Sequence, residues 1–283
     1  MKIKYFLVVA AMLSLVTACS SRKDSNSQAS FRKQPVMTVI SETNESTPLV
    51  FSHRGSIYTD PEHSFAGYDE AIKEGTAFIE QDVWLSRDGK LFVTHDDNLK
   101  RTTGVDINVS QSTAEQVQRV HLANGEKIHT LSQVLKHYGN KIHFIIESKH
   151  SDDGKVIPTQ KALMDVLKSN KQTNNVIIQD SAIDGLAYLH LNSDFKKIPT
   201  LWLAPGSTVE EYWAALNDAP EWLTYFSTNI EYTTKSLVKE ARKRGFKTDV
   251  WTILEYSDNK QANKLHVDSV FTNSTETTLK TLK

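Results

Sequence analysis

Glu80 and Asp82 are the residues of this chain whose types and spacing point most directly to chemistry. They lie two positions apart in the run 77–84, and side chains of a strand alternate between its faces, so both carboxylates point the same way. The run is otherwise apolar on both faces, as in a strand buried within a parallel sheet. Two ionised acids there need a cation, because burying an unpaired charge costs several kcal/mol. An edge strand with a solvated acidic face is the alternative interpretation.

Other short apolar runs also end in charged or titratable residues. These residues are His53, Arg54, His95, Glu147 and Lys149. The carboxyl ends of parallel strands converge on one edge of an open sheet or one end of a barrel. We therefore expect the three acids, the two histidines and the two cations to lie together.

This set of side chains suits metal-assisted cleavage of a phosphodiester. Three carboxylates without cysteine or histidine favour a hard cation, Ca²⁺ or Mg²⁺, over Zn²⁺. Arg54 can bind two phosphate oxygens through its planar guanidinium, and Lys149 adds a second positive charge. The reaction needs one proton removed from the attacking hydroxyl and one given to the leaving group, and two imidazoles can do both. Which histidine is the base stays open at this point.

Seven motifs in family order resemble the glycerophosphodiester phosphodiesterase family over most of residues 48–283. They are His53-Arg54-Gly55, Pro61-Glu62-His63-Ser64, 79–83, 88–96, Arg101-Thr102-Thr103-Gly104, 146–149 and Val250-Trp251-Thr252. The resemblance implies a divalent metal on Glu80, Asp82 and Glu147, and acid and base roles for His53 and His95. It also implies that Arg54 and Lys149 hold the phosphate, with Glu62 and Trp251 beside the substrate.

The resemblance further implies hydrolysis of deacylated phospholipids to sn-glycerol 3-phosphate and an alcohol. Two alternatives remain open. One is a lysophospholipase D-like phosphodiesterase whose substrate keeps an acyl chain. The other is a surface binding protein that retains the barrel without turnover.

Two residues depart from the family pattern. His63 stands where the family usually has asparagine, which puts a titratable group beside the pocket, although we expect the histidines other than His53 and His95 to be structural or exposed. Asn273 stands where the family usually has aspartate, and we interpret it as a structural cap, because asparagine caps about as well as aspartate. The alternative is that this position helps to orient a catalytic group, and Asn273→Asp should then raise turnover.

The chain reads as a single α/β domain over residues 48–283. Strand-like runs fall at 49–53, 77–83, 143–148, 175–179, 199–203, 224–228, 248–252 and 268–272, and helical patterns lie between them. This alternation predicts parallel topology, and the family resemblance makes it a TIM (β/α)8 barrel. A hairpin strand at 91–95 and a short insertion at about 97–135 follow the second strand.

The first 19 residues resemble a bacterial lipoprotein signal. Two lysines precede a short apolar core, and Cys19 follows Leu15-Val16-Thr17-Ala18. Cys19 is the only cysteine of the chain, so lipidation would explain it; a secretory signal with an incidental cysteine is the alternative. We expect residues 20–47 to form a flexible tether. The domain would then be exported and lipid-anchored to a bacterial membrane, on its periplasmic or cell-surface side.

The overall charge gives no electrostatic signature of a nucleic-acid partner. The chain has 33 basic and 34 acidic residues, for a net charge of −1. Nucleic-acid-binding domains instead concentrate positive charge on one surface. The expected partners are therefore a small glycerophosphodiester and, through the lipid anchor, a membrane.

Overall fold

The computed structural model describes residues 28–150 and 156–282, and its centre is a closed barrel of parallel strands. The strands run in the order β1-β9-β8-β7-β6-β5-β4-β2, and β1 pairs with β2 to close the ring. Their bounds are β1 Leu49–Ser52, β2 Phe78–Leu85, β4 His143–Ser148, β5 Val176–Asp180, β6 Thr200–Leu203, β7 Tyr225–Asn229, β8 Lys247–Ile253 and β9 Ser269–Thr272. The predicted TIM barrel is confirmed.

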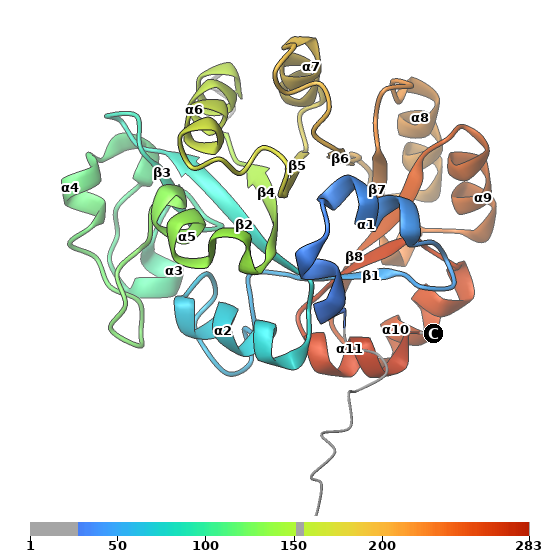
Figure 1. Ribbon diagram of the computed structural model, residues 1–283, viewed down its shortest axis with the longest axis horizontal. Coiled ribbons are helices and arrows are strands. Elements are labelled where there is room, and N and C mark those ends of the chain that lie inside the picture. The colour runs from blue at the N-terminus through green and yellow to red at the C-terminus, as the bar shows by residue number, and fades with distance from the viewer. Residues whose placement is uncertain (1–27, 151–155, 283) are drawn as a thin grey trace, which may run out of the picture.

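Helices surround the barrel on its outside (Figure 1). They are α2 Phe65–Glu74, α5 Leu131–Tyr138, α6 Val156–Ser169, α7 Ile183–Leu191, α8 Val209–Asp218, α9 Lys235–Lys243, α10 Tyr256–Leu265 and α11 Thr275–Thr281. The sequence sets the ends of α2, because the Ser64 hydroxyl accepts a hydrogen bond from Gly67 N–H and Gly75 ends the helix in a left-handed conformation. This cap holds the loop that follows β1 against the barrel end.

A hairpin and a small insertion separate β2 from α5. Strand β3, Leu91–Val93, pairs antiparallel with β2. The short helices α3 Lys100–Thr103, η2 Val109–Gln111 and α4 Ala114–Val117 follow, over a separate hydrophobic cluster that includes Phe92, Leu99 and Val117. The insertion ends at Leu131, where α5 begins. Helix α5 packs against the barrel strands, as the other surrounding helices do.

Alternation along the strands divides the side chains between the barrel interior and the helices. Phe51, Phe78, Ile145 and Tyr225 meet inside the barrel. The residues that follow them at even spacing along the same strands, such as Glu80 and Asp82 after Phe78, therefore also face the interior, closer to the carboxyl ends. Inside the barrel, a layer of apolar side chains therefore lies beneath the polar side chains of the carboxyl end.

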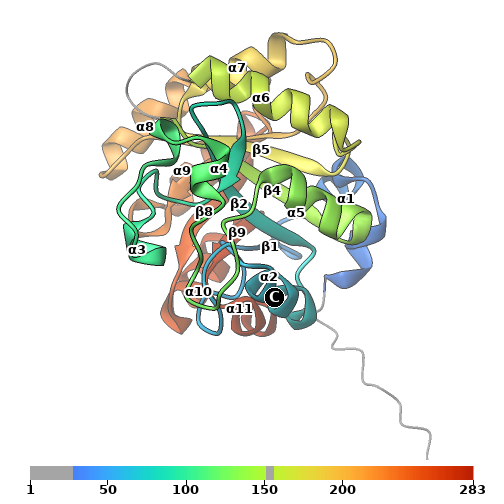
Figure 2. The ribbon, with the colours of Figure 1, turned by 90° about the vertical axis from the view of Figure 1, so that its left-hand side faces the viewer.

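The expectation of a flexible tether over residues 20–47 is wrong for residues 29–42. They form η1 Ala29–Lys33 and α1 Val36–Glu42, and Val36, Val39 and Ile40 are buried against the barrel interior. Helix α1 therefore closes one end of the barrel, and Figure 2 shows it at the end opposite α3. The apolar side chains at i, i+3 and i+4 give α1 a face to bury, which a tether lacks.

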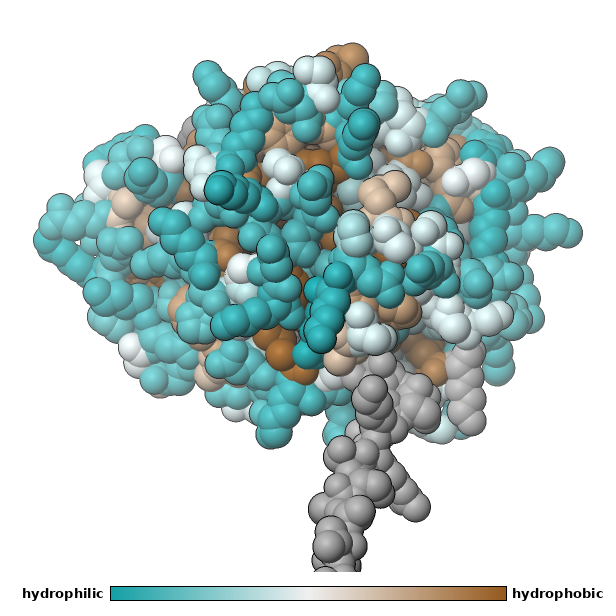
Figure 3. Space-filling view, viewed as in Figure 1, coloured by the Kyte–Doolittle hydropathy of each residue, from teal (hydrophilic) through white to brown (hydrophobic). Residues whose placement is uncertain are grey.

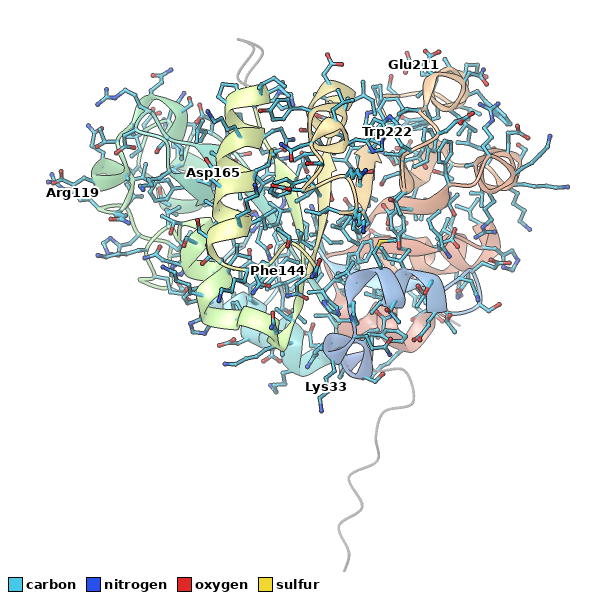
Figure 4. The ribbon with its side chains drawn as sticks, turned by 45° about the horizontal axis from the view of Figure 1, so that its top comes forward. Lys33, Arg119, Phe144, Asp165, Glu211 and Trp222 are labelled. Atoms are coloured by element: carbon cyan, nitrogen blue, oxygen red, sulfur yellow. The ribbon has the colours of Figure 1, made fainter. Side chains whose placement is uncertain are left out.

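The remaining N-terminal predictions fall outside the described residues. Both the signal over 1–19 and the lipidated Cys19 lie there. Across residues 28–150 and 156–282, no helix combines the length and the apolar character needed to cross a membrane. The face seen in Figure 3 is mostly hydrophilic. In Figure 4 the exposed side chains of Lys33, Arg119 and Glu211 project from the periphery.

Candidate active site

A cavity of about 260 Å³ opens at the carboxyl end of the barrel strands. Its lining residues are His53, Arg54, His95, Glu147, Lys149, Gln179, Leu203, Trp251, Thr252 and Phe271. Six of the residues singled out from the sequence are in this set, and they come from β1, β3, β4 and β8 or the loops that follow them. The structure thus brings together side chains that lie up to 198 positions apart in the chain.

Three carboxylates lie at this end of the barrel interior. Glu80 and Asp82 are each 1 % exposed, and Asp82 is in register with Glu147 on the neighbouring strand. Lys149 Nζ bridges them, 2.6 Å from Glu147 Oε1 and 3.2 Å from Asp82 Oδ1. Arg54 Nε lies 3.5 Å from Asp82 Oδ2. The acids are therefore buried and only partly neutralised by the cations present.

The pKa values of these acids reflect a shortage of positive charge. Burial, and then the neighbouring Asp82, raise the pKa of Glu80 well above its usual range. Burial also raises the pKa of Glu147 to about 7. Burial opposes ionisation of Asp82 as well, but Lys149 and the hydrogen bond with His63 hold its pKa well below the usual range. Asp82 is the carboxylate that stays ionised, and the other two need a further cation to do so.

The carboxylates fit a divalent cation on one further observation. Oε1 of Glu80 is buried and has no hydrogen-bond partner within the part of the chain that the structure describes. A buried carboxylate oxygen without a partner is costly, and a bound cation would satisfy it. His63, Glu80 and Asp82 each offer a ligand atom, and these atoms lie within 4.8 Å of one another. Glu147 stands apart from this group and is bound by Lys149 and Gln179.

His53 is held by Asn273 from the end of β9. Its Nδ1 lies 2.7 Å from Asn273 Oδ1, so the amide oxygen accepts the Nδ1 proton and leaves Nε2 free as a base. Burial, and then Arg54, lower the pKa of His53 to about 4. The interpretation of Asn273 as a helix cap is wrong, because Ser274 is the N-cap of α11 and the Asn273 side chain contacts His53.

His95 is held by a carboxylate instead. Its Nδ1 lies 2.7 Å from Asp96 Oδ1, and Arg101 binds the second oxygen of Asp96. Arg101 also forms two hydrogen bonds to Glu62, at 2.7 and 2.8 Å. Burial lowers the pKa of His95, while Asp96 acts against this shift. The two histidines thus have unlike partners, one neutral and one anionic.

Glu62 is engaged by cations and does not line the cavity. Arg101 binds both of its carboxylate oxygens, and Arg54 Nη1 lies 3.5 Å from Oε2. Glu62 therefore contacts Arg54 and stabilises the loop that carries Arg54. Trp251 does line the cavity, where it forms an apolar wall with Leu203 and Phe271.

His63 lies deeper than the sequence indicated. It is 3 % exposed, with Nε2 3.0 Å from Asp82 Oδ2 and Nδ1 2.8 Å from Tyr68 Oη. The only signal in the sequence was a histidine at a position where asparagine is usual. Asn273 carried a signal of the same kind, an asparagine where aspartate is usual. The contacts of Asp96 with His95 and of Tyr68 with His63 carried none, although these residues lie one and five positions apart.

Comparisons with known proteins identify the family of this chain. The sequence profile of the glycerophosphoryl diester phosphodiesterase family matches residues 53–277. A glycerophosphodiester phosphodiesterase of Caldanaerobacter subterraneus subsp. tengcongensis is 29 % identical over 81 % of this chain and 95 % of the relative. One from Bacillus subtilis is 26 % identical over 80 % and 83 %. The crystal structure of a glycerophosphodiester phosphodiesterase from Thermotoga maritima has a TM-score of 0.64 at 25 % identity and covers 81 % of this chain and 96 % of that one.

Proposed function

The chain belongs to the glycerophosphoryl diester phosphodiesterase family, and we propose on this basis that it hydrolyses glycerophosphodiesters to sn-glycerol 3-phosphate and an alcohol with a bound divalent metal. The observation that carries the proposal is the arrangement of two histidines, His53 and His95, on one cavity with Arg54 and Lys149. Phosphodiester hydrolysis needs both proton transfers and neutralisation of the phosphate charge, and this set supplies both.

Arg54 and Lys149 bind the phosphate in this proposal. Both line the cavity, and each is paired with a carboxylate, Arg54 with Glu62 and Lys149 with Glu147. Although burial acts against its charge, Lys149 stays protonated because Asp82 and Glu147 raise its pKa. The guanidinium of Arg54 can form paired hydrogen bonds to phosphate oxygens. The cations thus orient the diester between the two histidines.

His53 acts as the general base and His95 as the general acid. Asn273 leaves Nε2 of His53 unprotonated, and the low pKa keeps the imidazole neutral at pH 7, ready to remove a proton from the attacking hydroxyl. Asp96 opposes the burial that lowers the pKa of His95 and so supports its imidazolium form, which can give its proton to the leaving alcohol. His53 thus ends the step with one proton more and His95 with one proton fewer, and the pair is restored when His53 releases its proton to solvent and His95 takes one up.

Glu80, Asp82 and Glu147 would hold the metal ion, as the buried oxygen of Glu80 without a partner supports, although Glu147 would first have to leave its contacts with Lys149 and Gln179. Oxygen ligands of this kind suit Ca²⁺ or Mg²⁺. When bound, such an ion neutralises charge on a phosphoryl oxygen as the transition state forms.

The volume of the cavity favours a deacylated substrate. At about 260 Å³ it lies below the range of about 300–1,000 Å³ that is typical of pockets for larger organic ligands. One observation favours a substrate that keeps an acyl chain as the second candidate. Tyr58, Leu254 and Tyr256 are 65, 53 and 56 % exposed and follow the carboxyl ends of β1 and β8, the first two in loops and Tyr256 at the start of α10. They could contact a chain that leaves the cavity.

We also propose that the protein is exported and anchored through a lipid on Cys19. Residue 28, the first described, is hydrogen-bonded through its side chain to Pro48 and Val50 beside β1. An anchor upstream would therefore attach near the end of the barrel that α1 closes, leaving the cavity at the opposite end accessible. Incorporation of labelled fatty acid into the wild type, and its absence in Cys19→Ala, would support the anchor; equal labelling would exclude it.

The proposed function is tested by product release. The purified protein is incubated with glycerophosphocholine, glycerophosphoethanolamine and lysophosphatidylcholine, and sn-glycerol 3-phosphate and lysophosphatidic acid are measured. The assay is repeated in EDTA and after adding back Ca²⁺ or Mg²⁺. Metal-restored release of sn-glycerol 3-phosphate supports the proposal, and lysophosphatidic acid as the dominant product favours the second candidate. No product from folded, metal-supplied protein contradicts both and favours a binding role.

A further inference from the structure

His63 occupies an unusual backbone conformation directly beside the carboxylates. Its φ is 60°, in the left-handed region, which few residues other than glycine adopt. The side chain is buried and reaches from the loop after β1 to Asp82 on β2. Strained backbone of this kind persists where the surrounding contacts fix it, and it is often found at functional sites.

Tyr68 holds the ring of His63 on the side away from Asp82. Nδ1 of His63 lies 2.8 Å from Tyr68 Oη, which in turn lies 3.3 Å from the backbone oxygen of Glu80. Nε2 is therefore the ring nitrogen that faces the carboxylates. Metal-ligating histidines are usually held in this way, through a hydrogen bond of the other ring nitrogen.

Nε2 of His63 faces the carboxylates. It lies 3.0 Å from Asp82 Oδ2, to which it is hydrogen-bonded, and the ligand atoms of His63, Glu80 and Asp82 lie within 4.8 Å of one another. A divalent ion bound by Nε2 and Oδ2 would take the place of the proton that they share, because metal binding releases protons from its ligands. Oε1 of Glu80, buried and without a partner among the described residues, could bind the same ion.

We propose that His63 donates Nε2 to the divalent ion that Glu80 and Asp82 bind, and that Tyr68 is the positioning residue that holds the ring for it. This inference rests on the metal-dependent hydrolysis proposed above. A nitrogen ligand shifts the preference of the site toward transition-metal ions, because imidazole suits ions such as Zn²⁺ better than carboxylates alone do. The site would therefore bind a transition-metal ion more tightly, relative to Ca²⁺, than three carboxylates alone would, and Mn²⁺ serves as the paramagnetic probe.

The direct test is pulsed electron paramagnetic resonance on the full chain loaded with Mn²⁺. A ¹⁴N coupling from a directly bound imidazole is expected in the wild type and in the control His53→Asn, and it is expected to be lost in His63→Asn. Asparagine is a matched replacement, since it also tolerates the left-handed conformation. Wild-type protein with ¹⁵N-labelled histidine should show the corresponding ¹⁵N coupling, which keeps the test valid if a variant does not fold.

Metal affinity gives a second readout. His63→Asn should raise the Kd for Mn²⁺ about 10- to 100-fold while changing the Kd for Ca²⁺ less, and Tyr68→Phe should weaken Mn²⁺ binding about tenfold. Bound Mn²⁺ without nitrogen coupling in the wild type would overturn the inference and show that His63 only hydrogen-bonds Asp82. Metal-restored hydrolysis in that same sample would leave the proposed function standing. Nitrogen coupling without any hydrolysis would instead contradict the proposed function and still support His63 as a metal ligand.

Discussion

His53 and Asn273 meet across 220 residues of sequence, with His53 Nδ1 2.7 Å from Asn273 Oδ1. The contact orients the imidazole and fixes its proton on Nδ1, but a neutral amide does little to stabilise the imidazolium form. Because burial dominates, the pKa of His53 falls to about 4. Burial therefore sets how strong a base His53 is, and the neutral Asn273 offsets burial only in part.

Asn273→Asp should therefore strengthen the base. An anionic partner within hydrogen-bond distance raises the pKa of a histidine by about one to three units. The acidic limb of the pH profile of kcat/KM should move upward by that amount, and kcat at pH 7 should rise. Asn273→Ala should lower kcat without such a shift. An unchanged acidic limb in Asn273→Asp would show that His53 does not titrate in this limb.

Asp96→Asn should weaken the proposed acid. Asp96 orients His95 and favours its imidazolium form, so its loss should lower kcat about 10- to 100-fold, within the contribution usual for general acid catalysis, with little change in KM. Asp106→Asn, an exposed acid of the same insertion paired with Lys100, is the matched control and should keep the wild-type kcat. Equal kcat for Asp96→Asn and the control would contradict the role of Asp96.

Helix α1 should contribute to stability. Ile40 is 4 % exposed against the barrel interior, so Ile40→Ala should lower the free energy of unfolding by about 2–5 kcal/mol. Met37 lies on the same helix and is 52 % exposed, so Met37→Ala should change the free energy of unfolding little. Urea unfolding measures both. Equal, small effects would mean that α1 is not a stable part of the barrel in solution.

The buried Asp249 should make stability fall with rising pH. It accepts hydrogen bonds from Ser227 and Ser269 inside the barrel, and burial raises its pKa to about 7. The folded state then binds the proton more tightly than the unfolded state, whose pKa is about 3.8. The stabilisation is complete below about pH 4 and is lost as pH rises to about 7, by up to about 4 kcal/mol.

Asp249→Asn should remove this pH dependence, since an amide can bond both serines without ionising. The unfolding free energy of the variant relative to the wild type should increase from pH 5 to pH 8, and urea unfolding at each pH measures it. Asp165→Asn, an exposed acid on α6, is the control and should follow the wild-type curve. A constant difference between Asp249→Asn and the wild type across this range would mean that Asp249 does not titrate there.

The sequence predicted the barrel well because its strands are short, apolar runs bounded by turn residues. It also predicted which side chains converge, since their place at strand ends determines this. It did not predict α1, although Val36, Val39 and Ile40 have helical spacing, because the polar composition of the surrounding segment outweighed three residues. Contacts such as His63 with Asp82 depend on the path of a loop, which strand and helix patterns do not specify.

The roles of His53 as general base and His95 as general acid can be tested most directly with two substrates that differ in their leaving group. The kcat of the wild type, His53→Ala and His95→Ala would be measured on glycerophosphocholine and on the p-nitrophenyl ester of glycerol phosphate, whose leaving group departs without a proton. We expect His95→Ala to lose about 10²–10⁴-fold on glycerophosphocholine and far less on the nitrophenyl ester, whereas His53→Ala loses similar amounts on both. Equal losses for His95→Ala on the two substrates would contradict its role as the acid, and full activity in either variant would contradict the two-histidine mechanism.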